Sequence, residues 1–219
     1  MSSLYARIEE FQHILTVLAR DLEYLRPQLG SRLVGDETGP DEFAVRRAYV
    51  RAAFALIEGM TEQYSAVLID LSQAGLIDLP LGRHEVLAPY AYAASDSGTI
   101  VARPQYLTLE RKLRVVARAS DSAFDGRMGD RFADEAWKSF RGAIATRNSL
   151  AHPKCVGDCY VEDEQLDMVD AVGDWFTSLH NEFVRSATKH RQATGWKADS
   201  ERHTRPGAAP RRTGLQTET

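Results

Sequence analysis

Apolar residues recur every three or four positions along most of this chain, and this spacing constrains the fold more than any other feature. It is the spacing that gathers side chains on one face of an α-helix. Similar patterns predict helices over about 3–28, 41–74, 108–124, 131–151 and 162–188. The first pattern consists of Leu4, Ile8, Phe11, Leu15, Leu18, Leu22 and Leu25. Because such helices must bury their apolar faces against one another, we expect an all-α fold, an antiparallel helical bundle.

Prolines and glycines interrupt this pattern. Pro27 with Gly30 is expected to end the first helix, and Asp130 is expected to cap the fourth. Residues 76–106 contain three prolines and two glycines and include β-like pieces such as 99–101. We therefore expect a long, partly ordered irregular insertion there, with room for a small hairpin.

The chain is predicted to have three segments. They are an N-terminal helix and linker over 1–39, the helical bundle over 40–188, and a disordered basic tail over 189–219. The tail carries seven Lys/Arg against three Asp/Glu, a charge of +4, whereas the whole chain carries −4 and residues 1–188 carry −8. An acidic body with a basic tail is a mild indication of an anionic partner. A solvated tail explains the same charges more simply.

Composition indicates a cytoplasmic protein. The N-terminus lacks the basic and then apolar pattern of a signal peptide, and no apolar run approaches the ~18 residues of a membrane span. The two cysteines, Cys155 and Cys159, cannot form a disulfide framework. With His152 they invite a zinc interpretation, but their spacing is unusual for zinc and no second pair exists. We expect free thiols, no metal and no cofactor.

The segment from Arg147 to Pro153 is the strongest candidate for chemistry. In the fourth predicted helix, Trp137, Phe140, Ile144, Arg147 and Ala151 form one stripe, so a cation occupies a position where the pattern favours an apolar residue. A buried charge needs a partner. In an ideal helix Arg147 and His152 are about 140° apart. Pro153 disfavours helical geometry at His152, so the histidine ring could swing back towards Arg147.

A purely structural interpretation of these residues is also open. His152 could bond the last carbonyls of its helix, and Arg147 could pair with a core carboxylate.

Glu58 lies in an apolar stretch of the second helix, on one side with Arg51 and Glu62. Glu58 could hold Arg147 by a charge-assisted hydrogen bond, carry a proton, or belong to a surface ion-pair face.

The stretch Arg-Asn-Ser-Leu-Ala-His-Pro, at the end of a helix in an all-α chain, resembles the HEPN motif. That motif is an arginine and a histidine with four to six residues between them, commonly with a polar residue after the arginine. The stretch from Arg51 to Tyr64 resembles the first core helix of such domains, and the similarity covers roughly residues 41–188. The resemblance implies a helical bundle that often dimerises, bringing two Arg…His motifs together. Many members are metal-independent endoribonucleases of toxin–antitoxin, anti-phage or RNA-processing systems, and others are binding modules.

The residue chemistry is compatible with RNA cleavage. RNA supplies its own nucleophile, the 2′-OH, and an enzyme must add a base, an acid and a cation for the phosphate. His152 could transfer protons, Arg147 could clamp the phosphate, and Asn148 could orient either group. A second His152 in a homodimer could act as the complementary acid, and the product would carry a 2′,3′-cyclic phosphate. The catalytic candidates are thus Arg147, Asn148, His152 and Glu58.

Two functions remain open at this stage, beside the plainer one of an interaction protein in which the motif occurs by chance. The first is a metal-independent endoribonuclease, acting as a homodimer on RNA and serving as a toxin or defence effector with an antitoxin or other regulatory protein as partner. The second is a non-catalytic helical module that binds RNA, nucleotide or a protein partner through the same cleft. The intact Arg147 and His152 favour the first. The acidic body argues mildly for the second, because ribonucleases usually present positive potential to their substrate, although a local basic cleft or the Arg-rich tail could supply it.

Overall fold

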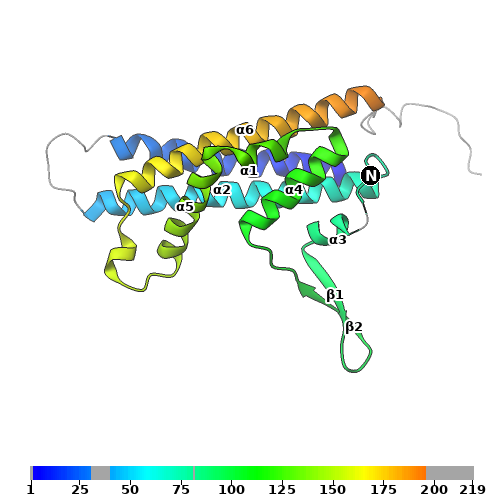
Figure 1. Ribbon diagram of the computed structural model, residues 1–219, viewed down its shortest axis with the longest axis horizontal. Coiled ribbons are helices and arrows are strands. Elements are labelled where there is room, and N and C mark those ends of the chain that lie inside the picture. Colours follow the sequence, from blue (N-terminus) through cyan, green and yellow to red (C-terminus); the bar gives the residue numbers. More distant parts are fainter. Residues whose placement is uncertain (1, 31–39, 81, 196–219) are drawn as a thin grey trace, which may run out of the picture.

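The computed structural model describes residues 2–30, 40–80 and 82–195. Three long helices, α1 (Ser2–Gly30), α2 (Pro40–Gln73) and α6 (Asp163–Thr194), lie along the length of the molecule (Figure 1). Two shorter helices, α4 (Leu109–Phe124) and α5 (Glu135–Ala151), complete the bundle. The prediction of an all-α helical bundle is confirmed.

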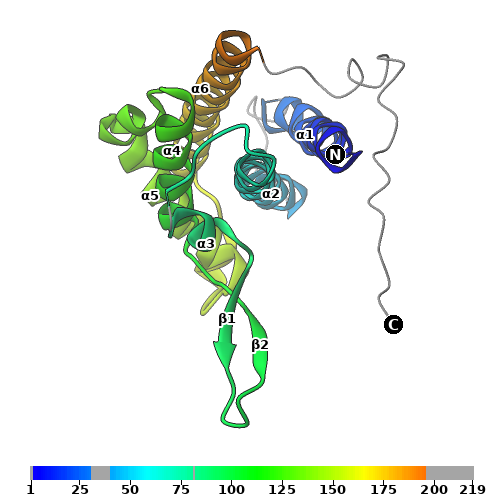
Figure 2. The ribbon, with the colours of Figure 1, turned by 90° about the vertical axis from the view of Figure 1, so that its right-hand side faces the viewer.

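Helix α2 is the centre of the bundle. It contacts α1 on one side and α4, α5 and α6 on the other (Figure 2). A helix with neighbours on several sides is apolar on several sides, and α2 buries a series of large side chains completely or almost completely. These are Val50, Phe54, Ile57, Met60, Tyr64, Leu68 and Leu71.

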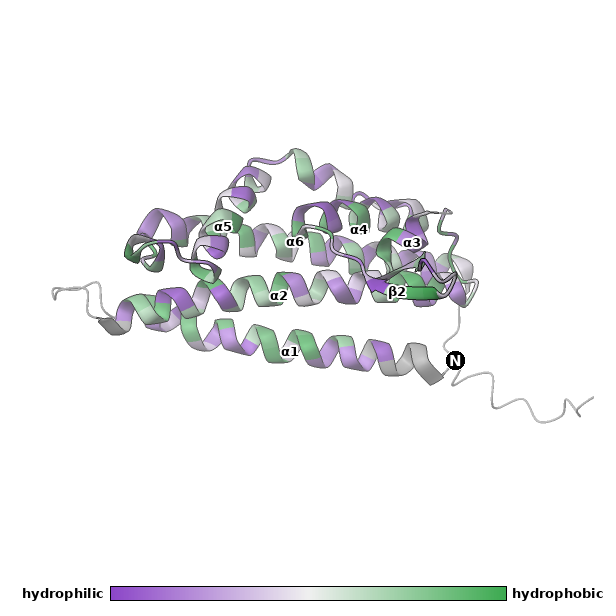
Figure 3. Ribbon diagram, turned by 90° about the horizontal axis from the view of Figure 1, so that it is seen from below, coloured by the Kyte–Doolittle hydropathy of each residue, from purple (hydrophilic) through white to green (hydrophobic). Residues whose placement is uncertain are grey.

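Helix α1 runs antiparallel to α2 and packs along it (Figure 3). Its contacts with the core come from a stripe of partly buried residues, Phe11, Leu15, Leu22, Leu25 and Leu29. The helix continues through Pro27 and ends at Gly30, so the prediction that Pro27 helps to end it is wrong. The predicted linker over 31–39 lies outside the described residues.

A cluster of aromatic rings fixes the rotation of α5. Trp137 stacks on Phe140 with ring centroids 4.9 Å apart, and both rings contact Trp175 of α6. The guanidinium of Arg114 on α4 lies 4.9 Å from the centre of the Trp137 ring, a cation–π contact. These contacts hold one face of α5 in the core, and Arg147 lies on the adjoining edge facing α2.

Two helix ends differ from the sequence predictions. Asp121 accepts hydrogen bonds from the backbone N–H groups of Met128 and Gly129, both at 2.7 Å. Residues 128–133 therefore form a 3₁₀ helix, η1 (Met128–Ala133), and α5 starts after Asp134 instead of Asp130. Helix α6 continues to Thr194, so the first residues of the predicted tail are helical, while 196–219 lie outside the described residues.

The predicted irregular insertion contains regular structure. A short helix, α3 (Arg83–Leu87), precedes two antiparallel strands, β1 (Tyr90–Ala94) and β2 (Ile100–Pro104). Their turn needs Gly98, whose φ of 78° is in the left-handed region. The small hairpin is confirmed, whereas α3 was not predicted. Among the described helices, none is long and apolar enough to cross a membrane.

Candidate functional site

Arg147 faces α2 near the end of α5. Its Nη2 donates to Glu58 Oε1 at 2.6 Å, and its Nη1 donates to Asn148 Oδ1 at 3.1 Å. The Arg147 and Glu58 side chains are 35% and 40% exposed, so solvent or a ligand can reach this pair. Arg147 is therefore not a buried core cation. Of the interpretations open for Glu58, the structure shows the direct hydrogen bond to Arg147.

A cavity of about 460 Å³ opens beside this ion pair. Three parts of the chain form its walls: α2, the segment that enters α4 together with the first turn of α4, and α5. The lining residues are Phe54, Glu58, Thr61, Glu62, Leu107, Thr108, Leu109, Glu110, Lys112, Ile144, Arg147 and Asn148. Three of the four predicted site residues, Glu58, Arg147 and Asn148, thus share one open cavity.

A second ion pair crosses the same cavity. Lys112 on α4 pairs with Glu62, which lies one turn after Glu58 on α2. Sequence reasoning did not assign Lys112 or Glu110 to the site. The sequence feature that could have indicated Lys112 is the spacing of Glu58 and Glu62. Two carboxylates four positions apart face the same side of a helix and can pair with cations on neighbouring helices. Counting Glu110, the lining holds three carboxylates and two cations.

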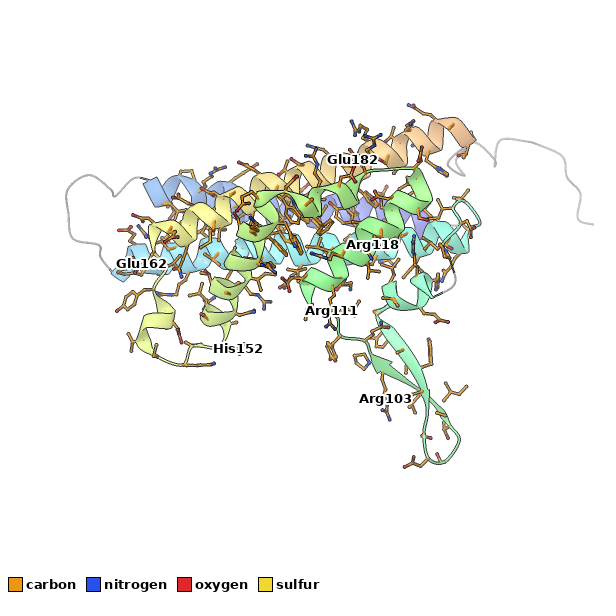
Figure 4. All side chains as sticks on the ribbon, in the orientation of Figure 1. Arg103, Arg111, Arg118, His152, Glu162 and Glu182 are labelled. Carbon is orange, nitrogen blue, oxygen red and sulfur yellow. The ribbon has the colours of Figure 1, made fainter. Side chains whose placement is uncertain are left out.

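His152 lies at the C-terminal end of α5, exposed to solvent (Figure 4). Its backbone has φ −135° and ψ 62°, outside the helical region, as predicted from Pro153. The imidazole is not part of the cavity lining, and no hydrogen bond joins it to Arg147. The expected return of the ring towards Arg147 is therefore not observed, and the chain continues from His152 into an exposed loop.

The loop after His152 is held by its own backbone and by α2. Asp158 Oδ2 accepts from the backbone N–H groups of Lys154 at 2.7 Å and Cys155 at 3.2 Å. These bonds favour the carboxylate and lower the pKa of Asp158 below its ordinary value. Arg47 on α2 donates to the Cys159 carbonyl at 3.0 Å.

Two further arginines of α2 tie this end of the molecule together. Arg51 Nη2 donates to the Leu150 carbonyl in the last turn of α5 at 3.3 Å. Arg46 is buried and donates to the Val161 carbonyl at 2.9 Å while pairing with Glu42 and Asp163, both at 2.7 Å. Both ends of the segment that contains His152 are thereby attached to α2.

Cys155 is exposed and Cys159 is partly buried, and both are free thiols. Within the described ranges, no three His, Cys, Asp or Glu side chains are grouped so that they could hold a metal ion.

No family model, curated protein or solved structure matches this chain. The resemblance of the Arg147–His152 segment to a ribonuclease motif thus depends on the residues and their placement on α5.

Proposed function

We propose that this protein is a HEPN-like, metal-independent endoribonuclease that cleaves RNA through the 2′-OH. The observation that carries the proposal is the position of Arg147, which lines an open cavity and is oriented by Glu58 and Asn148. His152 lies five residues after Arg147. Because Pro153 follows it, His152 has a non-helical backbone and is exposed to solvent. A fixed cation and a free imidazole at the same helix end are the groups that this reaction needs.

The reaction would proceed by transfer within the RNA. The 2′-oxygen loses its proton to a base and attacks the adjacent phosphorus, the bond to the 5′-oxygen breaks, and that oxygen takes a proton from an acid. Arg147 stabilises the charge on the phosphate oxygens through paired N–H donors. His152 moves a proton. The products are a 2′,3′-cyclic phosphate and a 5′-hydroxyl.

Two proton-transfer groups are required, and each chain supplies one His152. We therefore propose a homodimer in which the imidazole of each chain completes the site of the other. The position of His152 supports this arrangement, since an exposed ring outside the cavity of its own chain is free to reach a partner. The biological setting that we propose is a cytoplasmic toxin or defence effector restrained by an antitoxin or other regulatory protein.

One observation favours a second candidate, a non-catalytic helical module that binds RNA, nucleotide or a protein. The cavity lining has one more carboxylate than it has cations, and Glu58 already neutralises Arg147. A phosphate would have to compete with these carboxylates. In this alternative Arg147 positions α5 against α2, and His152 has no chemical role.

The experiment is cleavage of a mixed RNA pool by purified protein in EDTA, beside Arg147→Ala, His152→Ala and the control His84→Ala. We expect wild type and His84→Ala to leave 2′,3′-cyclic phosphate ends, detected by mass spectrometry. Arg147→Ala and His152→Ala should each reduce the rate at least about 100-fold. Equal activity in all four proteins would exclude this site. Inactivity in all four, with RNA binding retained, would favour the binding module.

A further inference from the structure

The β1–β2 hairpin projects from the bundle on the side where α5 ends (Figures 1 and 2). In the pairing, Tyr90 lies opposite Pro104, Tyr92 opposite Ala102, and Ala94 opposite Ile100. Because side chains alternate between the faces of a strand, these six residues share one face. Tyr90, Tyr92 and Ile100 are 52%, 76% and 73% exposed. The hairpin therefore presents two tyrosine rings on a face without charge.

The hairpin leads directly into the cavity beside Arg147. Tyr106, just after β2, is 89% exposed. The next residues, Leu107 and Thr108, belong to the cavity lining. A ligand that follows the chain from the hairpin past Tyr106 thus arrives at the proposed catalytic arginine.

Unpaired cations accompany this route. Arg103 is on β2 and Arg111 is in the first turn of α4, and both lie on the side of the molecule that carries His152 (Figure 4). Arg103 pairs with Ala91, so it is on the face of the hairpin opposite Tyr90 and Tyr92. In the described part of the chain, neither guanidinium takes part in an ion pair or a side-chain hydrogen bond. Between residues 88 and 109 the only other charged residue is Asp96. Arg111 therefore offers an unpaired positive charge at the entrance of the cavity, next to Glu110 of the cavity lining.

We propose that the hairpin is a docking platform for single-stranded RNA, an inference that builds on the proposed ribonuclease function. Bases stack on Tyr90, Tyr92 and Tyr106, while the free guanidinium of Arg111 contacts phosphates at the entrance of the cavity. Aromatic rings with nearby cations are the combination by which proteins hold single strands with little sequence preference. The free guanidinium of Arg111 favours an anionic strand over an apolar protein surface as the occupant.

The test measures binding without cleavage. A fluorescein-labelled 2′-O-methyl RNA of mixed sequence, which has no free 2′-OH, is titrated with wild type, Tyr90→Leu/Tyr92→Leu and Tyr90→Phe/Tyr92→Phe. Leucine keeps the face apolar but removes the stacking rings, whereas phenylalanine keeps the rings. We expect the leucine variant to bind at least about tenfold more weakly and the phenylalanine variant to stay within about twofold of wild type. Tyr24→Leu, at an exposed tyrosine on α1, should bind as wild type does.

Each other outcome overturns the platform. One is equal binding by the leucine variant and wild type, and another is no binding by wild type. A third is a wild-type dimer that the leucine variant converts to monomer in light scattering, because the face would then join two copies of the chain. A wild type that binds the RNA in a tyrosine-dependent way and yet cleaves none in the EDTA assay would refute the catalytic proposal and leave the docking platform standing.

Discussion

Arg147 and Glu58 meet at 2.6 Å although 89 positions separate them in the chain. Their bond joins α2 to α5 at the open cavity and fixes the plane of the guanidinium. Asn148 holds the other terminal nitrogen, and a guanidinium has five N–H donors. The remaining donors can therefore meet a phosphate without breaking the contact between the two helices.

Glu58→Gln should reduce RNA cleavage far more than it reduces stability. The exposed pair contributes at most about 1 kcal/mol to the free energy of unfolding. An arginine displaced by about 1 Å can cost roughly 100-fold in rate. We expect a change in unfolding free energy below about 1 kcal/mol by urea denaturation, with cleavage 10- to 100-fold slower.

The matched control is Glu135→Gln. Glu135 pairs with Lys138, also at 2.6 Å, on the exposed start of α5 and away from the cavity. This variant should cleave at the wild-type rate. Equal rates in Glu58→Gln and wild type would mean that the Arg147 guanidinium needs no carboxylate to orient it.

Arg46→Ala should destabilise the fold by about 3–5 kcal/mol, because it leaves the carboxylate of Glu42 buried without a partner. Arg46→Met/Glu42→Leu removes both charges and should recover most of this loss. Urea denaturation measures both effects. If the double variant is as unstable as Arg46→Ala, the Arg46 bonds to Val161 and Asp163 carry the stability instead.

The helical layout could be predicted because long amphipathic patterns report burial directly. The helix over 41–74 was placed within one residue at each end, since Pro40 favours the start of a helix and a left-handed Gly75 follows its end. The start of α5 was not predictable in the same way. The Asp121 carboxylate reaches forward from another helix to organise residues 128–133, and no local pattern shows such a bond.

The residues of the site could be predicted where a charged side chain interrupts the apolar pattern of a helix. Arg147 stood out as a cation on an apolar stripe, and Glu58 as a carboxylate in an apolar stretch. The contribution of Lys112 depends on how α4 crosses α2, which is a tertiary property. The path of the chain after His152 likewise depends on bonds from Arg46 and Arg47 across more than 100 positions.

Stability should increase as the pH rises through the ordinary pKa of histidine, because of His180. Its Nδ1 lies 2.9 Å from the Tyr64 hydroxyl, and its ring stacks on Phe11 of α1. Burial lowers the pKa of His180, so the folded state favours the neutral ring. This contribution is complete above about pH 6.5 and is lost as the pH falls below that value.

The measurement compares urea denaturation at pH 5.5 and 7.5 for wild type and His180→Gln. Wild type should lose more stability at pH 5.5 than the variant does. If the free energy of unfolding changes by the same amount between the two pH values in both proteins, groups other than His180 cause the pH dependence.

Asp158→Ala should loosen the loop after His152 while leaving the bundle intact. The carboxylate holds two backbone N–H groups, and the residue lies on the surface of the fold. Amide hydrogen exchange at Lys154 and Cys155 should accelerate at least about tenfold, with no change in exchange within α2. Because the pKa of Asp158 is lowered, the wild-type loop should also loosen as the pH falls below the ordinary value near 4.

Pro153→Ala tests whether the release of His152 from the helix is needed for function. Alanine permits the helical region at the preceding residue, so α5 can extend through His152 and turn its ring to a fixed helical position. We expect helical ¹³Cα chemical shifts at residues 152 and 153, a change in unfolding free energy below about 1 kcal/mol, and cleavage at least about tenfold slower. Pro80→Ala, in the segment between α2 and α3, is the control and should keep wild-type cleavage. A Pro153→Ala protein that gains the helical shifts and still cleaves RNA normally would show that His152 acts equally well from a helical position, and the proline would then have no part in catalysis.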